Sequence, residues 1–196
     1  MTKLRPSLLL GLIAASTSLF WQASIMVERV KFDALGDNWT QVEIELLCLG
    51  NSAPTARNAD FVENITVTPL LGYALANGEF RFYSASVEIM VMEARHKNSV
   101  YFYLPGPIVK RDALPVRPKY YSIELSVEGI PQDPRKSGKA LSRSIRDIAM
   151  LKNMQAIASA QLMQTNHLLL PAYFTPVKFT TQARNQPVFI RREAQP

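Results

Sequence analysis

The chain has few side chains that could perform chemistry. Its only histidines and cysteine are His96, His167 and Cys48. Neither histidine has a partner at the spacing that a zinc site requires, and no G-x-S-x-G elbow or phosphate-binding glycine loop occurs. Because a lone cysteine cannot form an intramolecular disulfide, we interpret Cys48 as a small buried hydrophobic residue.

The carboxylates are also arranged without a catalytic pattern. Glu43 and Glu45 are two residues apart, so on a strand they share the solvent face and are typical of an ordinary polar surface rather than of a glycosidase pair. Asp33, Asp37 and Asn38 in "DALGDN" lack the spacing of an EF-hand loop and indicate a turn. We therefore predict that the protein is not an enzyme and has no catalytic, cofactor-binding or metal-binding residues.

Aromatic and basic side chains are better suited to binding than to catalysis. Tyr101 and Tyr103 share one strand face, where an exposed pair could stack on sugars or anchor a protein, although a half-buried face is the simpler interpretation. A net charge of +6 is too small to predict nucleic-acid binding. If the basic residues converge in space, they could bind acidic glycans or lipid head groups. They are Lys110, Arg111, Arg117, Lys119, Arg135, Lys136 and Lys139.

The elements that position these residues are mostly strands. In "TQVEIELLCLG" the apolar residues Val42, Ile44, Leu46 and Cys48 alternate with polar ones, which predicts a half-buried strand. The same alternation occurs at 80–92, 99–105 and 119–128, and more weakly at 25–34 and 61–68. Residues 173–182 and 186–192 resemble a closing hairpin around "ARN". Short strands joined by turns favour an antiparallel sandwich or barrel.

One long helix, predicted at 140–169, interrupts this pattern. Ser144 with Asp147 resembles a capping box, although Ser137 or Ser142 could begin the helix, and Pro171 ends it. No charged residue occurs between Asn153 and Val177, whereas a surface helix normally displays a charged face. Three explanations remain open: the helix packs within its own fold, it is covered by another protein, or it touches a membrane through Lys139, Arg143 and Arg146. The candidate partner interface comprises Met150, Met154, Ala160, Gln161, Tyr101 and Tyr103.

The N-terminus predicts export. Lys3 and Arg5 precede an apolar run from Leu8 to Ala15 and then small residues, as in a secretory signal peptide. The 22 residues between Arg5 and Glu28 carry no charge and could instead form an uncleaved membrane anchor. We therefore predict a signal peptide or anchor at 1–23 and one domain at 24–196, located in the periplasm, in the outer membrane or at the cell surface.

Two long stretches carry a resemblance to a known group of proteins. "IMVERVKFDALGDNWTQVEIELLCLGN" and "RFYSASVEIMVMEARHKNSVYFYLPGP", together with the helix, resemble immunoglobulin-like, type IV pilus-associated proteins of mucus-dwelling verrucomicrobial bacteria. The resemblance covers most of the chain after the leader. It implies a mostly β, immunoglobulin-like antiparallel sandwich with one long α-helix before the C-terminal strands.

The resemblance also implies a function. It implies a non-enzymatic binding or scaffolding role in a type IV pilus-like assembly, with envelope proteins of a pilus or secretion-type assembly as partners. A surface adhesin or glycan-binding module is the alternative.

Two departures limit the resemblance. Gly11 is followed by "LIAAS" without the glutamate of a filament-forming pilin, so the chain is not predicted to be the filament subunit. Cys48 is alone, whereas an immunoglobulin domain proper has two bridging cysteines. The likeness is therefore one of architecture, which does not fix function.

Overall fold

The chain folds mostly into antiparallel strands. The computed structural model describes residues 24–52, 56–165 and 167–190. The strands are β1 (Ile25–Ala34), β2 (Thr40–Cys48), β3 (Phe61–Ala74), β4 (Phe80–Ser84), β5 (Val87–Glu93), β6 (Lys97–Leu104), β7 (Tyr120–Val127), β8 (Ile130–Pro131), β9 (Leu170–Pro171) and β10 (Val188–Ile190). The helices are η1 (Gly36–Asn38), α1 (Gly106–Arg111), α2 (Ile148–Thr165), η2 (Ala172–Phe174) and α3 (Val177–Thr180).

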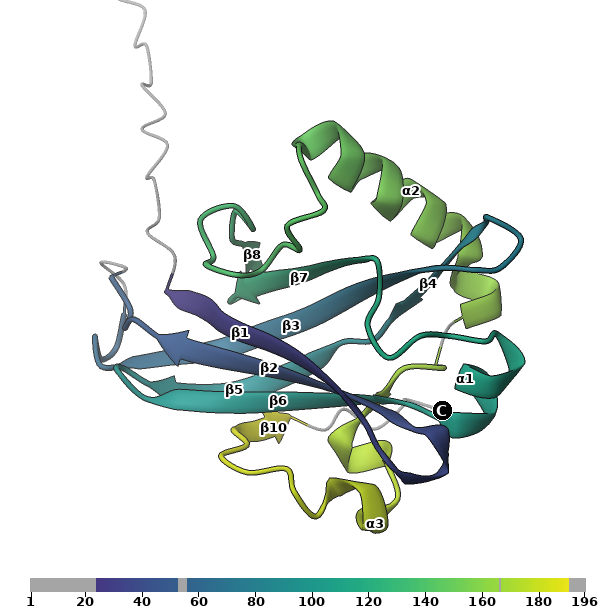
Figure 1. The fold of residues 1–196 in the computed structure, drawn as a ribbon. Coiled ribbons are helices and arrows are strands. Elements are labelled where there is room, and N and C mark those ends of the chain that lie inside the picture. The colour runs from purple at the N-terminus through teal and green to yellow at the C-terminus, as the bar shows by residue number, and fades with distance from the viewer. Residues whose placement is uncertain (1–23, 53–55, 166, 191–196) are drawn as a thin grey trace, which may run out of the picture.

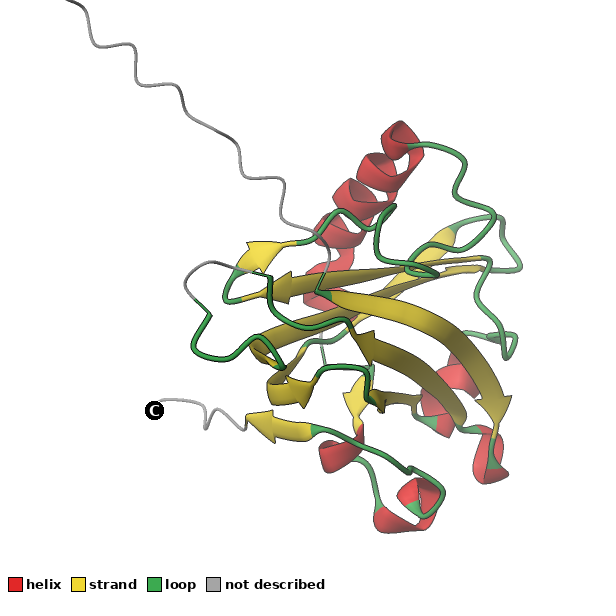
Figure 2. Cartoon of the chain, turned by 90° about the vertical axis from the view of Figure 1, so that its left-hand side faces the viewer, coloured by secondary structure: helices red, strands yellow, loops and turns green. Residues whose placement is uncertain are grey.

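The strands form two sheets that pack face to face (Figures 1 and 2). The first sheet has the order β1-β2-β6-β9, and the second has the order β10-β5-β3-β7-β8 with β4 paired to β3. All the strand pairs within these sheets are antiparallel. The predicted mostly β sandwich of the immunoglobulin-like kind, with one long helix before the C-terminal strands, is confirmed.

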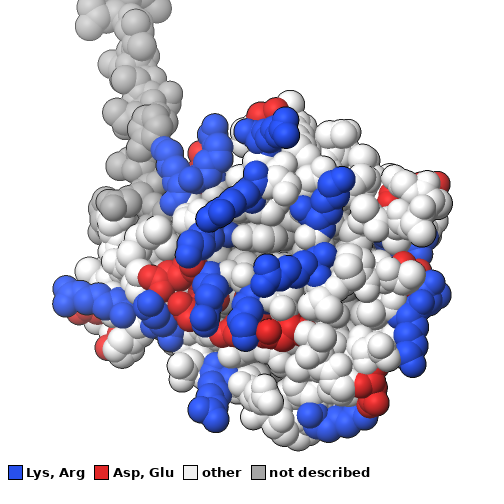
Figure 3. Space-filling view, viewed as in Figure 1, with Lys and Arg blue, Asp and Glu red and all other residues white. Residues whose placement is uncertain are grey.

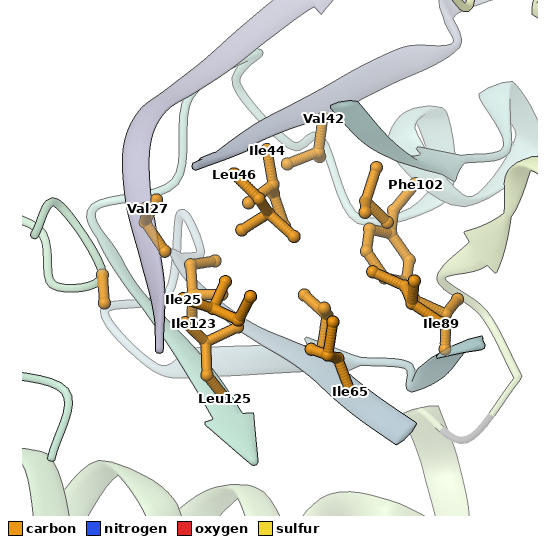
Figure 4. Close-up of a cluster of buried hydrophobic side chains, with 14 of the residues drawn as sticks. Ile25, Val27, Val42, Ile44, Leu46, Ile65, Ile89, Phe102, Ile123 and Leu125 are labelled. Atoms are coloured by element: carbon orange, nitrogen blue, oxygen red, sulfur yellow. The ribbon is translucent and has the colours of Figure 1, made fainter. Parts of the chain in front are cut away.

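The core lies between the sheets and explains the two-residue period of the sequence. Val42, Ile44 and Leu46 of β2 are fully buried and point at side chains of the second sheet such as Ile65 and Ile123 (Figure 4). The intervening residues of β2 are less buried because successive strand side chains point to opposite faces. One buried face per strand is the source of the pattern read from the sequence.

The strand predicted at 80–92 forms two strands. Ser84 of β4 pairs with Leu70, whereas Val87 of β5 pairs with Val67 on the same partner strand β3. β4 and β5 therefore run in the same direction along β3, but the strand pairing is interrupted at residues 85 and 86. The other strands that the alternation predicts are present, and β1 has the predicted bounds of 25–34.

The helix begins eight residues later than predicted. Residues 137–142 are not helical and pair with both sheets, because Val27 bridges to Gly138 and Ser122 bridges to Leu141. This pairing uses backbone groups that a helix start would need for itself. The prediction of a helix over 140–169 is therefore wrong at its N-terminal end and also extends past the observed C-terminal end, because α2 occupies 148–165.

The predicted C-terminal hairpin is wrong. Residues 172–180 form the short helices η2 and α3, and only Val188–Ile190 forms a strand there, which pairs with β5. Pro176 directly precedes α3, where its fixed φ and missing N–H suit a helix start better than a strand ladder. Residues 191 and 192 of the predicted hairpin lie outside the described residues.

Both outer faces of the sandwich are partly covered. Helix α2 lies over the outer face of the second sheet, and η2 and α3 lie beside the first sheet (Figure 1). Within the described ranges, no helix is long and apolar enough to cross a membrane.

Candidate interaction surface

Helix α2 starts at a well-defined cap. Asp147 immediately precedes the helix, and its Oδ1 accepts a hydrogen bond of 2.7 Å from the backbone N–H of Met150. This is the N-cap interaction that a short acidic side chain makes with a backbone donor of the first turn. Asp147 is thus the cap itself, rather than the second member of a box that Ser144 begins.

The inner face of α2 packs on an apolar area of the second sheet. Met154 and Ala158 are buried against Leu70 of β3 and Phe82 of β4, and half-buried Met150 packs at the border. Only 4% of Met154 is exposed. Met154, predicted as a partner contact, is therefore part of the protein's own packing.

Gln161 protects the edge of the second sheet. Its Oε1 accepts a 3.0 Å hydrogen bond from the N–H of Phe82, and its Nε2 donates a 2.8 Å hydrogen bond to the carbonyl of Phe80. Both groups belong to β4, which pairs with β3 on its other side. An unpaired strand edge exposes backbone donors and acceptors, and this amide satisfies one of each. Gln161 thus holds α2 on the sheet instead of facing a partner.

We expect Gln161→Ala to lower the free energy of unfolding by about 1 to 3 kcal/mol, because it leaves a partly buried backbone donor and acceptor of β4 without their partner. Amide exchange at Phe82 should accelerate at the same time. Gln164→Ala is the matched control, because Gln164 is an exposed glutamine of the same helix. Urea unfolding of both variants tests the assignment, and equal stability of the two variants would contradict it.

The opposite face of α2 is exposed, and Lys152 at its border is the one charged residue of the helix. We call it the α2 surface and define it by Asn153, Ala156, Ile157, Ala160 and Gln164, which are all exposed. Their spacing of three and four residues places them on one side of a helix. The side chain of Ile157 is 38% exposed. Solvent-facing helix surfaces are usually rich in Lys and Glu, so this face resembles the core of an interface more than a solvated surface.

Of the six residues predicted to form a partner interface, one lies on the α2 surface and one lies at its margin. Ala160 lies on the α2 surface, and Met150 lies at its margin with partial exposure. Asn153, Ile157 and Gln164 were missed by sequence reasoning. Projecting the helix around the buried Leu151, Met154 and Ala158 would have identified them as the opposite face.

A groove of about 300 Å³ runs beside the helix. It separates α2 from the outer face of the second sheet on the side of β7. Gln155 spans part of it by donating a 2.5 Å hydrogen bond to the carboxylate of Glu124. A chain bound to α2 could therefore contact the groove at the side of the helix as well as the outer face of the helix. Its lining residues are Thr68, Leu70, Ser84, Glu124, Gln155, Ala158 and Ser159.

Tyr101 and Tyr103 are not at the surface. Tyr103 is fully buried and Tyr101 is 5% exposed, because Ala172 and Phe179 of the C-terminal segment cover this face of β6. Burial raises the pKa of Tyr103 to about 12. The Oη of Tyr101 contacts Glu43 and the backbone of Arg184. The simpler interpretation of the sequence, in which this tyrosine face is covered, therefore agrees with the structure, and the alternative of an exposed pair that stacks on sugars does not.

Cys48 and His96 contact neighbouring groups of the fold. The Sγ of Cys48 lies 3.6 Å from the carbonyl of Met92, and burial raises the pKa of its thiol. Nδ1 of His96 lies 3.1 Å from the carboxylate of Glu93 at the surface. In the described part of the chain, no three His, Cys, Asp or Glu residues come together as a metal site.

The carboxylates that could have formed a glycosidase pair belong to a surface ion-pair network. Arg29 lies 3.6 Å from Glu43 and 3.0 Å from Glu45, on the outer face of the first sheet. Asp33 and Asp37 likewise pair with Lys31 and Lys178, at 2.8 and 2.7 Å. Both pairs of acidic residues thus have basic partners, as expected for an ordinary polar surface.

The basic residues do not form one patch. Lys110 and Arg111 lie on α1, which follows the Leu104 end of β6, while Lys139 is hydrogen-bonded to Val27 near the start of β1. The register of the first sheet places these at opposite ends, because Leu104 pairs with Thr40 and Ile25 pairs with Cys48. The seven basic residues therefore do not converge, and the condition for one shared binding site is not met.

The fold is an immunoglobulin-like β-sandwich with an added helix, α2. It differs from an immunoglobulin domain proper because Cys48 is a free cysteine and does not form an inter-sheet disulfide. No protein-family model matches the sequence, and no curated protein matches it. A crystal structure from Akkermansia muciniphila is similar in fold, with a TM-score of 0.59 and 14% sequence identity over 90% of this chain and 98% of that chain. That organism is a verrucomicrobe, in keeping with the resemblance found in the sequence. At this identity the similarity concerns the fold alone.

Proposed function

We propose that this protein is a non-enzymatic, exported envelope protein that binds another protein of a type IV pilus-like assembly through the α2 surface. The observation that carries the proposal is a firmly held helix whose exposed face has almost no charge. The cap at Asp147, the packing of Met154 and the amide of Gln161 hold that face in position. A preformed surface loses little conformational entropy on binding, which favours association.

The occupant that we propose is a protein rather than a sugar. Ala156 and Ala160 permit close approach of another backbone, and Ile157 supplies an apolar contact at the centre. Sugar binding usually relies on exposed aromatic rings, and the tyrosine pair considered for that role is buried. The resemblance of the sequence to verrucomicrobial pilus-associated proteins, together with the fold of the A. muciniphila structure, supports a pilus-like assembly as the setting.

We expect the double variant Ile157→Glu/Ala160→Glu to lose at least 10-fold in affinity for its pilus-assembly partner, because a bound partner would have to desolvate two carboxylates. Both positions are exposed and glutamate is a good helix former, so the fold should be retained. The measurement is recovery of a secretin or pilus component with the tagged full-length protein from native envelopes.

The control is Val116→Glu/Ala34→Glu. Val116 is 38% exposed, as is Ile157, and Ala34 is an exposed alanine, so the added charge and the lost apolar area are matched. Ala34 lies far from α2, on β1 of the other sheet. The control should recover the partner as the unmodified protein does. Equal recovery by both double variants would overturn the proposed role of the α2 surface.

A further inference from the structure

Residues 132–147, which we call the basic segment, close one side of the sandwich. In residues 137–142 the N–H of Lys139 donates to the carbonyl of Val27 at 2.7 Å, and the carbonyl of Ala140 accepts from Ile123 at 2.7 Å. The segment therefore pairs with β1, the edge strand of the first sheet, and with the part of β7 that β8 leaves unpaired. Gly138 has a φ of +70°, and a Cβ there would lie 2.5 Å from the carbonyl oxygen of Val27. Glycine thus permits the close approach to β1.

The pairing gives the segment an inner and an outer side. Ser137, Ala140 and Ser142 are buried, whereas Lys139 and Arg143 are exposed. Residues 132–147 contain five basic residues and two acidic ones, a net charge of +3. We call the exposed Lys139, Arg143 and Arg146 the edge cations. Within the described residues, none of these three makes an ion pair with a carboxylate, whereas Arg135 is paired with Asp133 at 2.8 Å.

The domain begins beside this segment. The backbone N–H groups of Ser24 and Ile25 donate to Oε1 of Gln132 at 2.7 and 3.2 Å, and Nε2 of Gln132 donates to the carbonyl of Ile25. The start of the domain is therefore fixed to the first residues of the basic segment. Figure 3 shows Lys and Arg side chains gathered on this side of the molecule. Ile130 on neighbouring β8 adds an apolar side chain that is 46% exposed.

The sequence before the domain suits a membrane more than a soluble ligand. Residues 6–23 precede the folded domain and carry no charge. This run of 18 residues lies within the range of about 17 to 25 that crosses the hydrocarbon core of a bilayer as a helix. A domain tethered through residue 24 would have the edge cations close to the lipid head groups. Lys and Arg near an anionic membrane surface are attracted to it, and a neighbouring apolar side chain can insert at the interface.

We infer that the edge cations, with Ile130 beside them, form a docking surface for anionic phospholipids, which holds the domain against the membrane at the point where its chain begins. This contact is separate from the α2 surface and does not depend on the proposed protein partner. It would orient the domain, because one side of the sandwich faces the bilayer.

The test compares full-length variants on two kinds of vesicle. The triple variant Lys139→Gln/Arg143→Gln/Arg146→Gln should bind vesicles of phosphatidylcholine with 30% phosphatidylglycerol about 100-fold more weakly than the unmodified protein, because each removed charge costs roughly 5-fold near an anionic surface. On pure phosphatidylcholine the two proteins should bind equally, since that binding depends on the apolar N-terminal segment they share. Raising the salt to about 0.5 M should remove the difference.

The control removes three cations from the opposite end of the sandwich. Lys110→Gln/Arg117→Gln/Lys178→Gln has the same net charge as the test variant, and its positions are exposed. The control should lose less than 5-fold of its binding to anionic vesicles. Equal losses in the two triple variants, or unchanged anionic binding in the test variant, would overturn the inference. Binding of a soluble acidic polysaccharide that abolishes vesicle binding at low concentration would also overturn it, in favour of a glycan ligand.

Discussion

Replacing Asp112 by alanine is expected to lower the free energy of unfolding by about 3 kcal/mol, because the buried hydroxyl of Tyr83 loses its acceptor and two partly exposed arginines lose their shared anion. The carboxylate is 4% exposed and lies directly after α1. It accepts hydrogen bonds from Arg81 at 2.8 Å, from Arg111 at 2.9 and 2.7 Å, and from the hydroxyl of Tyr83. Without it, the fully buried Tyr83 hydroxyl loses its acceptor.

Asp133→Ala provides a matched control for this prediction. Asp133 also accepts two hydrogen bonds from an arginine, Arg135, but the side chain of Asp133 is 28% exposed, against 4% for Asp112. Exposed ion pairs contribute little because water and salt screen them. Urea unfolding at neutral pH should therefore show a large loss for Asp112→Ala and a small one for Asp133→Ala. Similar losses would contradict the central place of Asp112.

The pH dependence of stability gives a second readout of the same residue. Hydrogen bonds from Arg111 and then from Tyr83 lower the pKa of Asp112 to about 2, against the opposing effect of burial. Because the folded-state pKa is lower than the unfolded one, the stability from this carboxylate is present above about pH 4 and is lost as the pH falls toward 2. The difference in stability between the unmodified protein and Asp112→Asn should narrow over that window.

Gly106→Ala is expected to cost about 3 kcal/mol, at the upper end of what overpacking normally costs. Gly106 is buried at the start of α1, and a Cβ there would lie 1.9 Å from the carbonyl oxygen of Asp37 and 3.2 Å from the indole of Trp39. The nearest obstacle is backbone, which cannot rotate away as a side chain could. Either α1 or η1 must therefore move.

Gly36→Ala is the control for this substitution. Gly36 belongs to η1, the element that faces Gly106, but a Cβ there would have no atom within 4 Å. Thermal unfolding should separate the two variants clearly, with Gly36→Ala close to the unmodified protein. A Gly106→Ala variant of unchanged stability would mean that α1 and η1 do not meet closely.

The strands could be predicted from the sequence because one face of each strand is buried. Val42, Ile44 and Leu46 show this pattern, as does the correctly bounded β1. The segment 137–142 could not be predicted, because its conformation depends on pairing with Val27 and Ile123 from strands far away in the sequence. Local propensity for a helix is outweighed there by tertiary hydrogen bonds.

The candidate site was only partly predictable for the same reason. A polar residue within a charge-poor helix suggested that Gln161 faces outward, but its amide meets the edge of β4, 81 residues away. Alternation placed Tyr101 and Tyr103 together on one face, but it could not reveal that Ala172 and Phe179 cover them. The exposure of Ala160 can be deduced once the buried face of the helix is known.

The most direct test of the proposed function is photo-crosslinking in the native cell. A photoreactive residue placed at Asn153 or Ala160 lies on the α2 surface, and one placed at Met154 faces the protein's own sheet. The first two positions are predicted to capture the same pilus or secretin component, identified by mass spectrometry. Met154 should give only links within the chain, chiefly to Leu70 and Phe82. Intramolecular links alone at Asn153 and Ala160 would contradict a partner on the α2 surface.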